Sequence, residues 1–130
     1  MKNKKYENLT KQLQILTQFN SVSGNEAALV SWLKSQLEEH ADQVKIDAVG
    51  NLIATKGNPV VAIFTHVDKV GYMVSELIPD VGVKVVPLSK GKAVPPEGAG
   101  WMVEVGENKV KGVLYKDVVL IDSQSLNKIQ

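Results

Sequence analysis

The sequence contains no cysteine and no arginine among its 130 residues. Without cysteine the chain can form no disulfide, no thiolate zinc site and no thiol nucleophile, a composition that suits a reducing cytoplasm. All 15 basic residues are lysines and the formal net charge is +1. The basic patches and bidentate arginine contacts that nucleic-acid binding uses are therefore missing. We expect a cytoplasmic protein with no nucleic-acid partner.

Long apolar runs are missing as well. No stretch approaches the roughly 20 residues that a membrane-spanning helix needs, and no apolar core follows the basic N-terminus as it would in a signal peptide. Apolar residues nevertheless make up 44% of the chain and charged residues 22%, which is typical of a folded globular protein. We expect a folded protein with no membrane partner.

Two amphipathic helices are predicted in the first forty residues. A helix over residues 6–19 would carry a leucine stripe on one face, and a second stripe continues to about residue 40. Ser23 and Glu26 have the spacing of a capping box, with the serine at the N-cap of the second helix. We expect both helices to cover one face of a sheet.

The pattern changes to strands after residue 42. Residues 44–47 and 52–55 predict two short strands, and the five apolar residues 60–64 predict a buried one. Sixteen of the twenty valines lie at or beyond Val60, which is typical of a β-rich second half. Further strands are expected at residues 71–77, 83–88, 101–105, 110–115 and 118–121, with a loop at 91–100.

The predicted order is two helices, two strands, a central strand and then a β-meander. A change of composition falls near residues 69–76. We therefore expect two parts, residues 1–70 and residues 71–130, the first of α/β class and the second β-rich.

His66 and Asp68 follow the apolar run directly. In extended backbone, residues two apart point to the same side, so the imidazole and the carboxylate would be neighbours. A carboxylate that accepts from Nδ1–H leaves Nε2 free to bind a metal. Two interpretations stay open from spacing alone: a structural histidine with a carboxylate partner, or a metal ligand placed where open α/β sheets hold their sites.

Four further side chains have simpler interpretations. His40 near a helix end suits the helix dipole, and Ser21 and Ser23 are better explained as capping residues than as nucleophiles, since no triad partner accompanies them. Lys69 is interpreted as a solvated side chain rather than a catalytic one, and its charge could also repel a nearby cation.

Three segments together resemble a known family. They are residues 21–26 (Ser-Val-Ser-Gly-Asn-Glu), residues 47–54 (Asp-Ala-Val-Gly-Asn-Leu-Ile-Ala) and residues 65–74 (Thr-His-Val-Asp-Lys-Val-Gly-Tyr-Met-Val). Their order and spacing are similar to the start of the glutamyl and deblocking aminopeptidases, two-metal exopeptidases of the wider zinc aminopeptidase clan. The resemblance covers residues 9–77. The remainder looks like the beginning of the inserted β-barrel domain of that family.

The resemblance implies a fold and a set of roles. The fold would be the N-terminal part of an α/β/α phosphorylase/hydrolase-like aminopeptidase domain, followed by the start of the inserted barrel. His66 would bind one of two divalent ions, zinc or cobalt, and Asp68 would orient it. The substrate would be a peptide with a free N-terminus, and members of the family form dimers or dodecamers, which implies a homo-oligomer.

The chain also departs from the family. Position 69 is lysine where the family often has an acidic residue, and the bridging aspartate, the general-base glutamate, a further carboxylate and the last histidine have no counterpart here. Asp117 and Asp122 are not positioned as substitutes by the sequence pattern. A two-metal site needs several ligands, so we expect at most one weak metal site and little or no activity. The alternatives are a non-catalytic binding or assembly protein that retains the scaffold, and a mononuclear metal protein.

Overall fold

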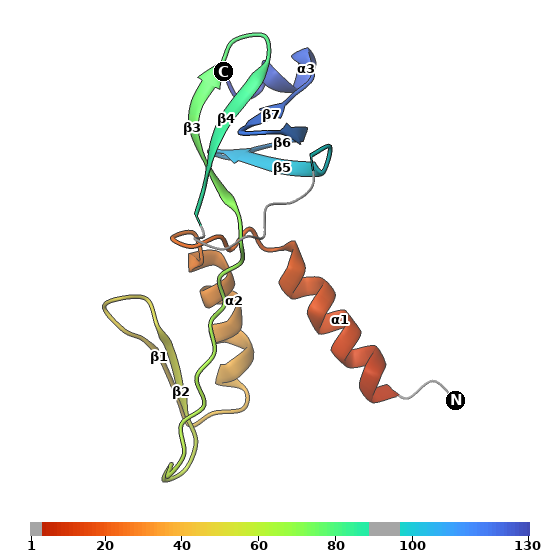
Figure 1. Cartoon of the computed structure of the whole chain (residues 1–130). Helices are drawn as coiled ribbons and strands as arrows, with labels where there is room; N and C mark the ends of the chain where they lie inside the picture. Colours follow the sequence, from red (N-terminus) through yellow and green to blue (C-terminus); the bar gives the residue numbers. More distant parts are fainter. Residues whose placement is uncertain (1–3, 89–96) are drawn as a thin grey trace. The chain divides into compact units, whose positions relative to one another are not determined.

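The chain divides into two compact units. The structure, a computed structural model, describes residues 4–88 and 97–130. Unit 1 is Met1–Lys69 and unit 2 is Val70–Gln130. The loop expected over residues 91–100 lies mostly outside the described residues. Within the described ranges, no helix combines the length and the apolar character that crossing a membrane requires. Both units mix regular and irregular backbone, as Figure 1 shows.

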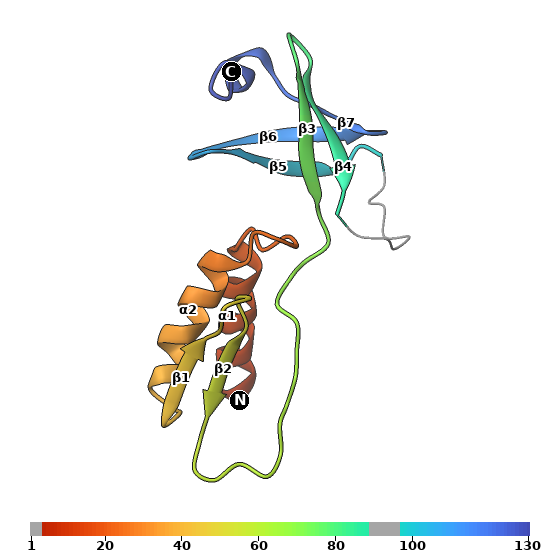
Figure 2. The same ribbon diagram turned by 90° about the vertical axis from the view of Figure 1, so that its left-hand side faces the viewer.

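Unit 1 contains the two predicted helices and the first strand pair. These elements are α1 (Lys4–Gln18), α2 (Ala27–Glu38), β1 (Gln43–Ile46) and β2 (Leu52–Thr55). The two strands pair in antiparallel orientation, and α2 packs against both of them, as both views show (Figures 1 and 2). The amphipathic pattern and the alternation of the strands therefore predicted these elements to within a few residues.

The turn between β1 and β2 is closed by one carboxylate. Asp47 Oδ1 accepts the backbone N–H groups of Val49 and Asn51 at 3.0 and 2.8 Å, and Oδ2 accepts from Asn51 Nδ2 at 2.8 Å. The Asn51 side chain and backbone are the main reasons why the pKa of Asp47 is lowered. Gly50 supplies the positive φ, 93°, that the turn requires.

The expectation that both helices cover a sheet is wrong for α1. Leu9 and Leu13, which form its apolar stripe, are exposed. A hairpin of two four-residue strands offers too little surface for a second helix. Within the described part of unit 1, the buried apolar side chains are Leu29 and Val30 of α2. Unit 1 therefore has only a very small core.

The prediction of a buried strand at residues 60–64 is also wrong. The segment forms no strand and runs as irregular extended chain (Figure 2). Val60 is 98% exposed and Phe64 is 91% exposed. An apolar run with no polar alternation suits a strand that is covered on both faces and paired along its edges. No residue among those described forms strand pairing with this segment, so it lacks the neighbours that a buried strand requires.

Unit 2 contains five strands and a short helix. They are β3 (Tyr72–Ile78), β4 (Gly82–Pro87), β5 (Gly100–Val105), β6 (Asn108–Tyr115), β7 (Val118–Leu120) and α3 (Ser123–Leu126). All neighbours are antiparallel, in the order β3-β4-β7-β6-β5. The predicted meander is correct for β5, β6 and β7. It is wrong for the sheet as a whole, because β7 pairs with β4 on its other edge.

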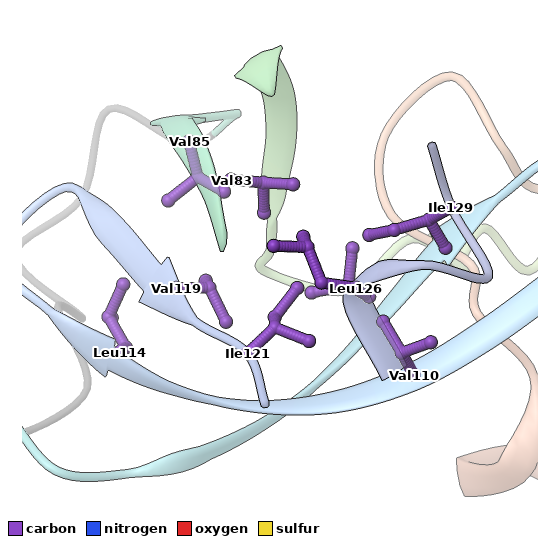
Figure 3. Close-up of a cluster of buried hydrophobic side chains, with 9 residues drawn as sticks. Val83, Val85, Val110, Leu114, Val119, Ile121, Leu126 and Ile129 are labelled. Atoms are coloured by element: carbon purple, nitrogen blue, oxygen red, sulfur yellow. The ribbon is translucent and has the colours of Figure 1, made fainter. Parts of the chain in front are cut away.

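One face of this sheet forms the core of unit 2. Alternate residues of β4 and β6 are buried, as expected for strands with one face inward. Leu126 and Ile129, in and just after α3, pack onto the same face and are also buried. Figure 3 shows these side chains converging. The buried set is Val83, Val85, Val103, Val110, Leu114, Val119, Ile121, Leu126 and Ile129.

Two glycines allow β7 to lie between β4 and β6. A Cβ atom on Gly82 would stand 2.0 Å from the carbonyl oxygen of Val119, and one on Gly112 would stand 2.4 Å from the Val119 side chain. Gly82 also has a φ of 152°, which disfavours any side chain. The pairing of β7 on both edges therefore requires glycine at these positions.

We predict that Gly82→Ala lowers the free energy of unfolding of unit 2 by about 2 kcal/mol or more, because the new methyl group overlaps backbone that cannot move away. Chemical denaturation followed by circular dichroism measures the change. Gly100→Ala is the matched control, since a Cβ atom there meets nothing within 4 Å. Equal stability of the two variants would contradict the prediction.

Candidate functional site

The His66 and Asp68 side chains are in contact. Asp68 Oδ1 lies 2.8 Å from His66 Nδ1, and the Asp68 carbonyl oxygen lies 3.2 Å from the same nitrogen. The histidine side chain is 85% exposed and the aspartate side chain 39%. The predicted proximity is present, although the backbone that carries the pair is not part of a strand pairing with a sheet.

The second oxygen of Asp68 is held by Ser23. Ser23 Oγ donates to Asp68 Oδ2 at 2.7 Å, so the hydroxyl does not cap α2. The capping-box prediction is wrong: α2 has Glu26 at its N-cap position without a side-chain cap. The Glu26 carboxylate instead accepts the Gly24 N–H at 2.9 Å. The Ser23 hydroxyl therefore bonds to the His-Asp pair and does not cap the helix.

A short hydrogen-bonded seam holds this part of unit 1 together. Val22 and Lys69 form a parallel bridge, with the Lys69 N–H donating to Ser21 O at 2.8 Å. Ser21 Oγ donates to Val67 O at 3.2 Å, and Ser21 is 1% exposed. The loop between the two helices thus supports the segment on which the pair sits.

Lys69 has a structural partner. Its Nζ donates to the carbonyl oxygens of Phe19 and, at 3.2 Å, of Thr17. These carbonyls lie at the C-terminal end of α1, where the helix dipole favours a cation. The interpretation of Lys69 as a solvated side chain is therefore wrong, and its positive charge is directed toward α1.

The electrostatics of the pair favour one form of the imidazole. Hydrogen bonds lower the pKa of Asp68. The bond from Ser23 has the largest effect, and the bond from His66 has the next largest. An ionised carboxylate only accepts hydrogen bonds, so a neutral His66 that bonds to Asp68 carries its proton on Nδ1. Its Nε2 then presents a lone pair from an exposed ring.

The remaining candidates do not belong to the hydrogen-bonded group around Asp68. His40 is exposed and lies beyond the end of α2. Asp117 forms an ion pair with Lys84 at 3.8 Å, and Asp122 caps α3 by accepting from the Ser125 N–H at 2.9 Å. Sequence reasoning missed the link between Ser23 and Asp68, because 45 positions separate them and no local pattern connects them.

The residues present do not fit a two-metal centre. In the part of the chain that the structure describes, no three histidine, aspartate or glutamate side chains lie together as a metal would require. The pair offers one imidazole nitrogen, Nε2 of His66, while its carboxylate is already engaged on both oxygens. A two-ion hydrolytic site needs several more ligands.

We predict that the carboxyl group of Asp68 titrates below the range of an ordinary aspartate, and that Ser23→Ala raises this pKa, because a donor to the ionised form is lost. Since the folded-state pKa is depressed, any stability gained from Asp68 is present above the unfolded-state pKa and is lost as the pH falls through the folded-state pKa. Carboxyl carbon NMR shifts measured against pH report both values. Identical titration in wild type and variant would contradict the prediction.

Comparison with known proteins finds relatives that are named as aminopeptidases. No family model matches the chain. The glutamyl aminopeptidase of Lactococcus lactis subsp. cremoris (strain MG1363) is 32% identical over 82 residues, which cover 59% of this chain and 23% of that protein. The lysyl aminopeptidase of Pyrococcus furiosus is 46% identical over 54 residues, 40% of this chain and 16% of that protein. The chain thus spans under a quarter of either relative.

A solved structure has a similar fold. The crystal structure of a Thermotoga maritima protein, titled as an endoglucanase, matches 91% of this chain and 41% of that chain, with a TM-score of 0.66 and 26% identity. Its match extends over both units, whereas the two sequence relatives above cover 59% and 40% of the chain. The sequence relatives confirm the predicted resemblance to aminopeptidases: over part of its length, this mixed α/β chain is similar to a glutamyl and a lysyl aminopeptidase.

Proposed function

We propose that the chain is the N-terminal portion of a metal-dependent aminopeptidase that removes N-terminal residues from peptides. The observation that carries the proposal is the His66–Asp68 contact of 2.8 Å, which leaves Nε2 of an exposed ring free to bind a divalent ion such as zinc or cobalt. The relatives named aminopeptidases support the reaction class. The cytoplasm, a peptide substrate and a homo-oligomeric state belong to the same proposal.

The two units have separate roles in this proposal. Unit 1 is the first segment of the α/β catalytic domain, because it carries the His-Asp pair and an apolar run suited to a sheet covered on both faces. Unit 2 is the start of an inserted β-barrel domain. Its own core and its curled antiparallel sheet support this assignment.

A glycosidase is a less suitable reading, although the Thermotoga protein is titled an endoglucanase. Glycoside hydrolysis generally uses two carboxylic groups on either side of the scissile bond. The hydrogen-bonded group built on Ser23, His66 and Asp68 contains one carboxylate, and that carboxylate accepts from both neighbours. The arrangement suits an oriented imidazole better than an acid–base pair.

We predict that this chain alone shows no chelator-sensitive hydrolysis of aminoacyl anilides in the presence of cobalt or zinc, because one imidazole and one orienting carboxylate cannot hold two ions. Release of the anilide chromophore measures the activity. The Lactococcus glutamyl aminopeptidase is the positive control. Robust turnover that a chelator abolishes would contradict the prediction.

A second candidate function is a non-catalytic protein that uses the same scaffold for assembly. The observation in its favour is the exposed run at residues 60–64, with Ile63 at 93% and Phe64 at 91% exposure. Extended backbone with apolar side chains on both sides is a template for pairing with another strand. In this case the chain would form a defined oligomer through the run.

We predict that Ile63→Lys lowers the self-association of the chain, because a charge within the run opposes strand pairing. Sedimentation velocity gives the mass distribution. Val49→Lys is the matched control, since Val49 is an 83% exposed valine in the β1–β2 turn, outside the run. A monomeric wild-type chain, or equal association of both variants, would exclude assembly through this segment.

A further inference from the structure

The carboxylate of Asp68 receives one hydrogen bond on each oxygen. Oδ1 faces His66 Nδ1 at 2.8 Å and Oδ2 accepts from Ser23 Oγ at 2.7 Å. Two donors on opposite oxygens of one planar group fix its rotation as well as its position. With a single donor the carboxylate could rotate about its bond to Cβ and exchange its oxygens.

Ser23 is itself held in place by the backbone around it. Its neighbour Val22 bridges to Lys69, and the Val22 carbonyl accepts the Asn25 N–H at 2.8 Å in a tight turn. Gly24 adopts a φ of 91° in that turn. The hydroxyl therefore projects from ordered backbone that is connected to the residue following Asp68.

Strand pairing does not provide this support. The described residues 59–68 belong to no strand, so the His-Asp pair lacks the sheet that would normally orient a side chain at the end of a strand. The hydrogen bonds of this segment instead run to the loop before α2, in the seam between residues 21–23 and 67–69, and from the Lys69 ammonium to the end of α1.

We propose that Ser23 is a positioning residue that acts through Asp68 to keep the His66 proton on Nδ1 and the Nε2 lone pair exposed. This inference rests on the proposed function for its biological meaning, since an oriented Nε2 is what a metal ion needs. The geometry itself involves only residues of this chain. The hydrogen bond that places Ser23 in this group goes to the Asp68 carboxylate.

The experiment reads the tautomer of His66 in the metal-free chain. Long-range ¹H–¹⁵N NMR spectra distinguish a ring that carries its proton on Nδ1 from one that carries it on Nε2. The chain has two histidines, so the exposed His40 is an internal reference in every sample. Spectra are taken at about pH 8, above the ordinary pKa of a histidine side chain.

The expected result is an Nδ1–H tautomer at His66 in the wild type. Ser23→Ala lowers the ratio of Nδ1–H to Nε2–H about threefold, as the loss of a modest hydrogen bond to a charged acceptor predicts. Ser23→Thr keeps the hydroxyl and restores the wild-type ratio, and Ser23→Cys, a weak donor, gives an intermediate one. Asp68→Ala sets the ratio expected with no orienting carboxylate.

Ser35→Ala is the matched control. Ser35 is an exposed serine in the same unit, where its hydroxyl donates to the Trp32 carbonyl on α2 at 2.7 Å, and its loss leaves the ratio unchanged. An unchanged ratio in Ser23→Ala would overturn the proposal. Should Ser23→Ala not fold, a ratio in Ser23→Cys equal to that of the wild type would overturn it instead.

Zinc chloride added to the same samples separates this inference from the proposed function. Binding at Nε2 shifts the His66 ring nitrogens and leaves those of His40 in place. If zinc has no effect while the tautomer depends on Ser23, the positioning role stands and the metal site fails. If zinc shifts His66 equally in the wild type and in Ser23→Ala with unchanged tautomers, the positioning role fails and the metal site stands.

Discussion

The seam between the α1–α2 loop and residues 67–69 is the contact on which the candidate site depends. A polar backbone that leaves water must find partners, and here Ser21 and Lys69 provide them for each other. The buried Ser21 hydroxyl adds a bond to Val67 O. The Lys69 ammonium ties the same segment to the end of α1. His66 and Asp68 are thus placed by local hydrogen bonds, in a unit whose apolar core is too small to place them by packing.

The two units differ in how many of their apolar side chains are buried. Among the residues that the structure describes, unit 2 buries nine apolar side chains in one cluster, whereas unit 1 buries Leu29 and Val30. Hydrophobic stabilisation follows the area removed from water, so unit 2 gains far more of it. The exposed leucines of α1 and the run at residues 60–64 have the composition of core elements without the contacts of one. In this structure the apolar side chains of α1 and of residues 60–64 therefore remain largely exposed to solvent.

Local patterns predicted the local elements well. The leucine stripes predicted both helices, the short strand patterns at residues 44–47 and 52–55 predicted β1 and β2, and the valine-rich second half predicted the five strands of unit 2. Patterns failed where distant residues decide the outcome. The five apolar residues from Val60 predict a strand, but pairing needs neighbours that their own sequence does not specify. Ser23 has the spacing of a capping residue, yet its hydroxyl donates a hydrogen bond to Asp68, 45 positions away. The position of β7 beside β4 depends on the close approach at Gly82, which alternation does not encode.

The place of β7 in the sheet also bears on the order in which unit 2 can fold. The β3–β4 hairpin lies at the start of unit 2, but the free edge of β4 is paired only when residues 118–120 pair with residues 82–84. Leu126 and Ile129 then close the core. These pairings enclose long loops. Closing such loops costs conformational entropy before the favourable contacts form. During synthesis, the core-facing side of this hairpin therefore cannot be covered until residues 118–129 have emerged.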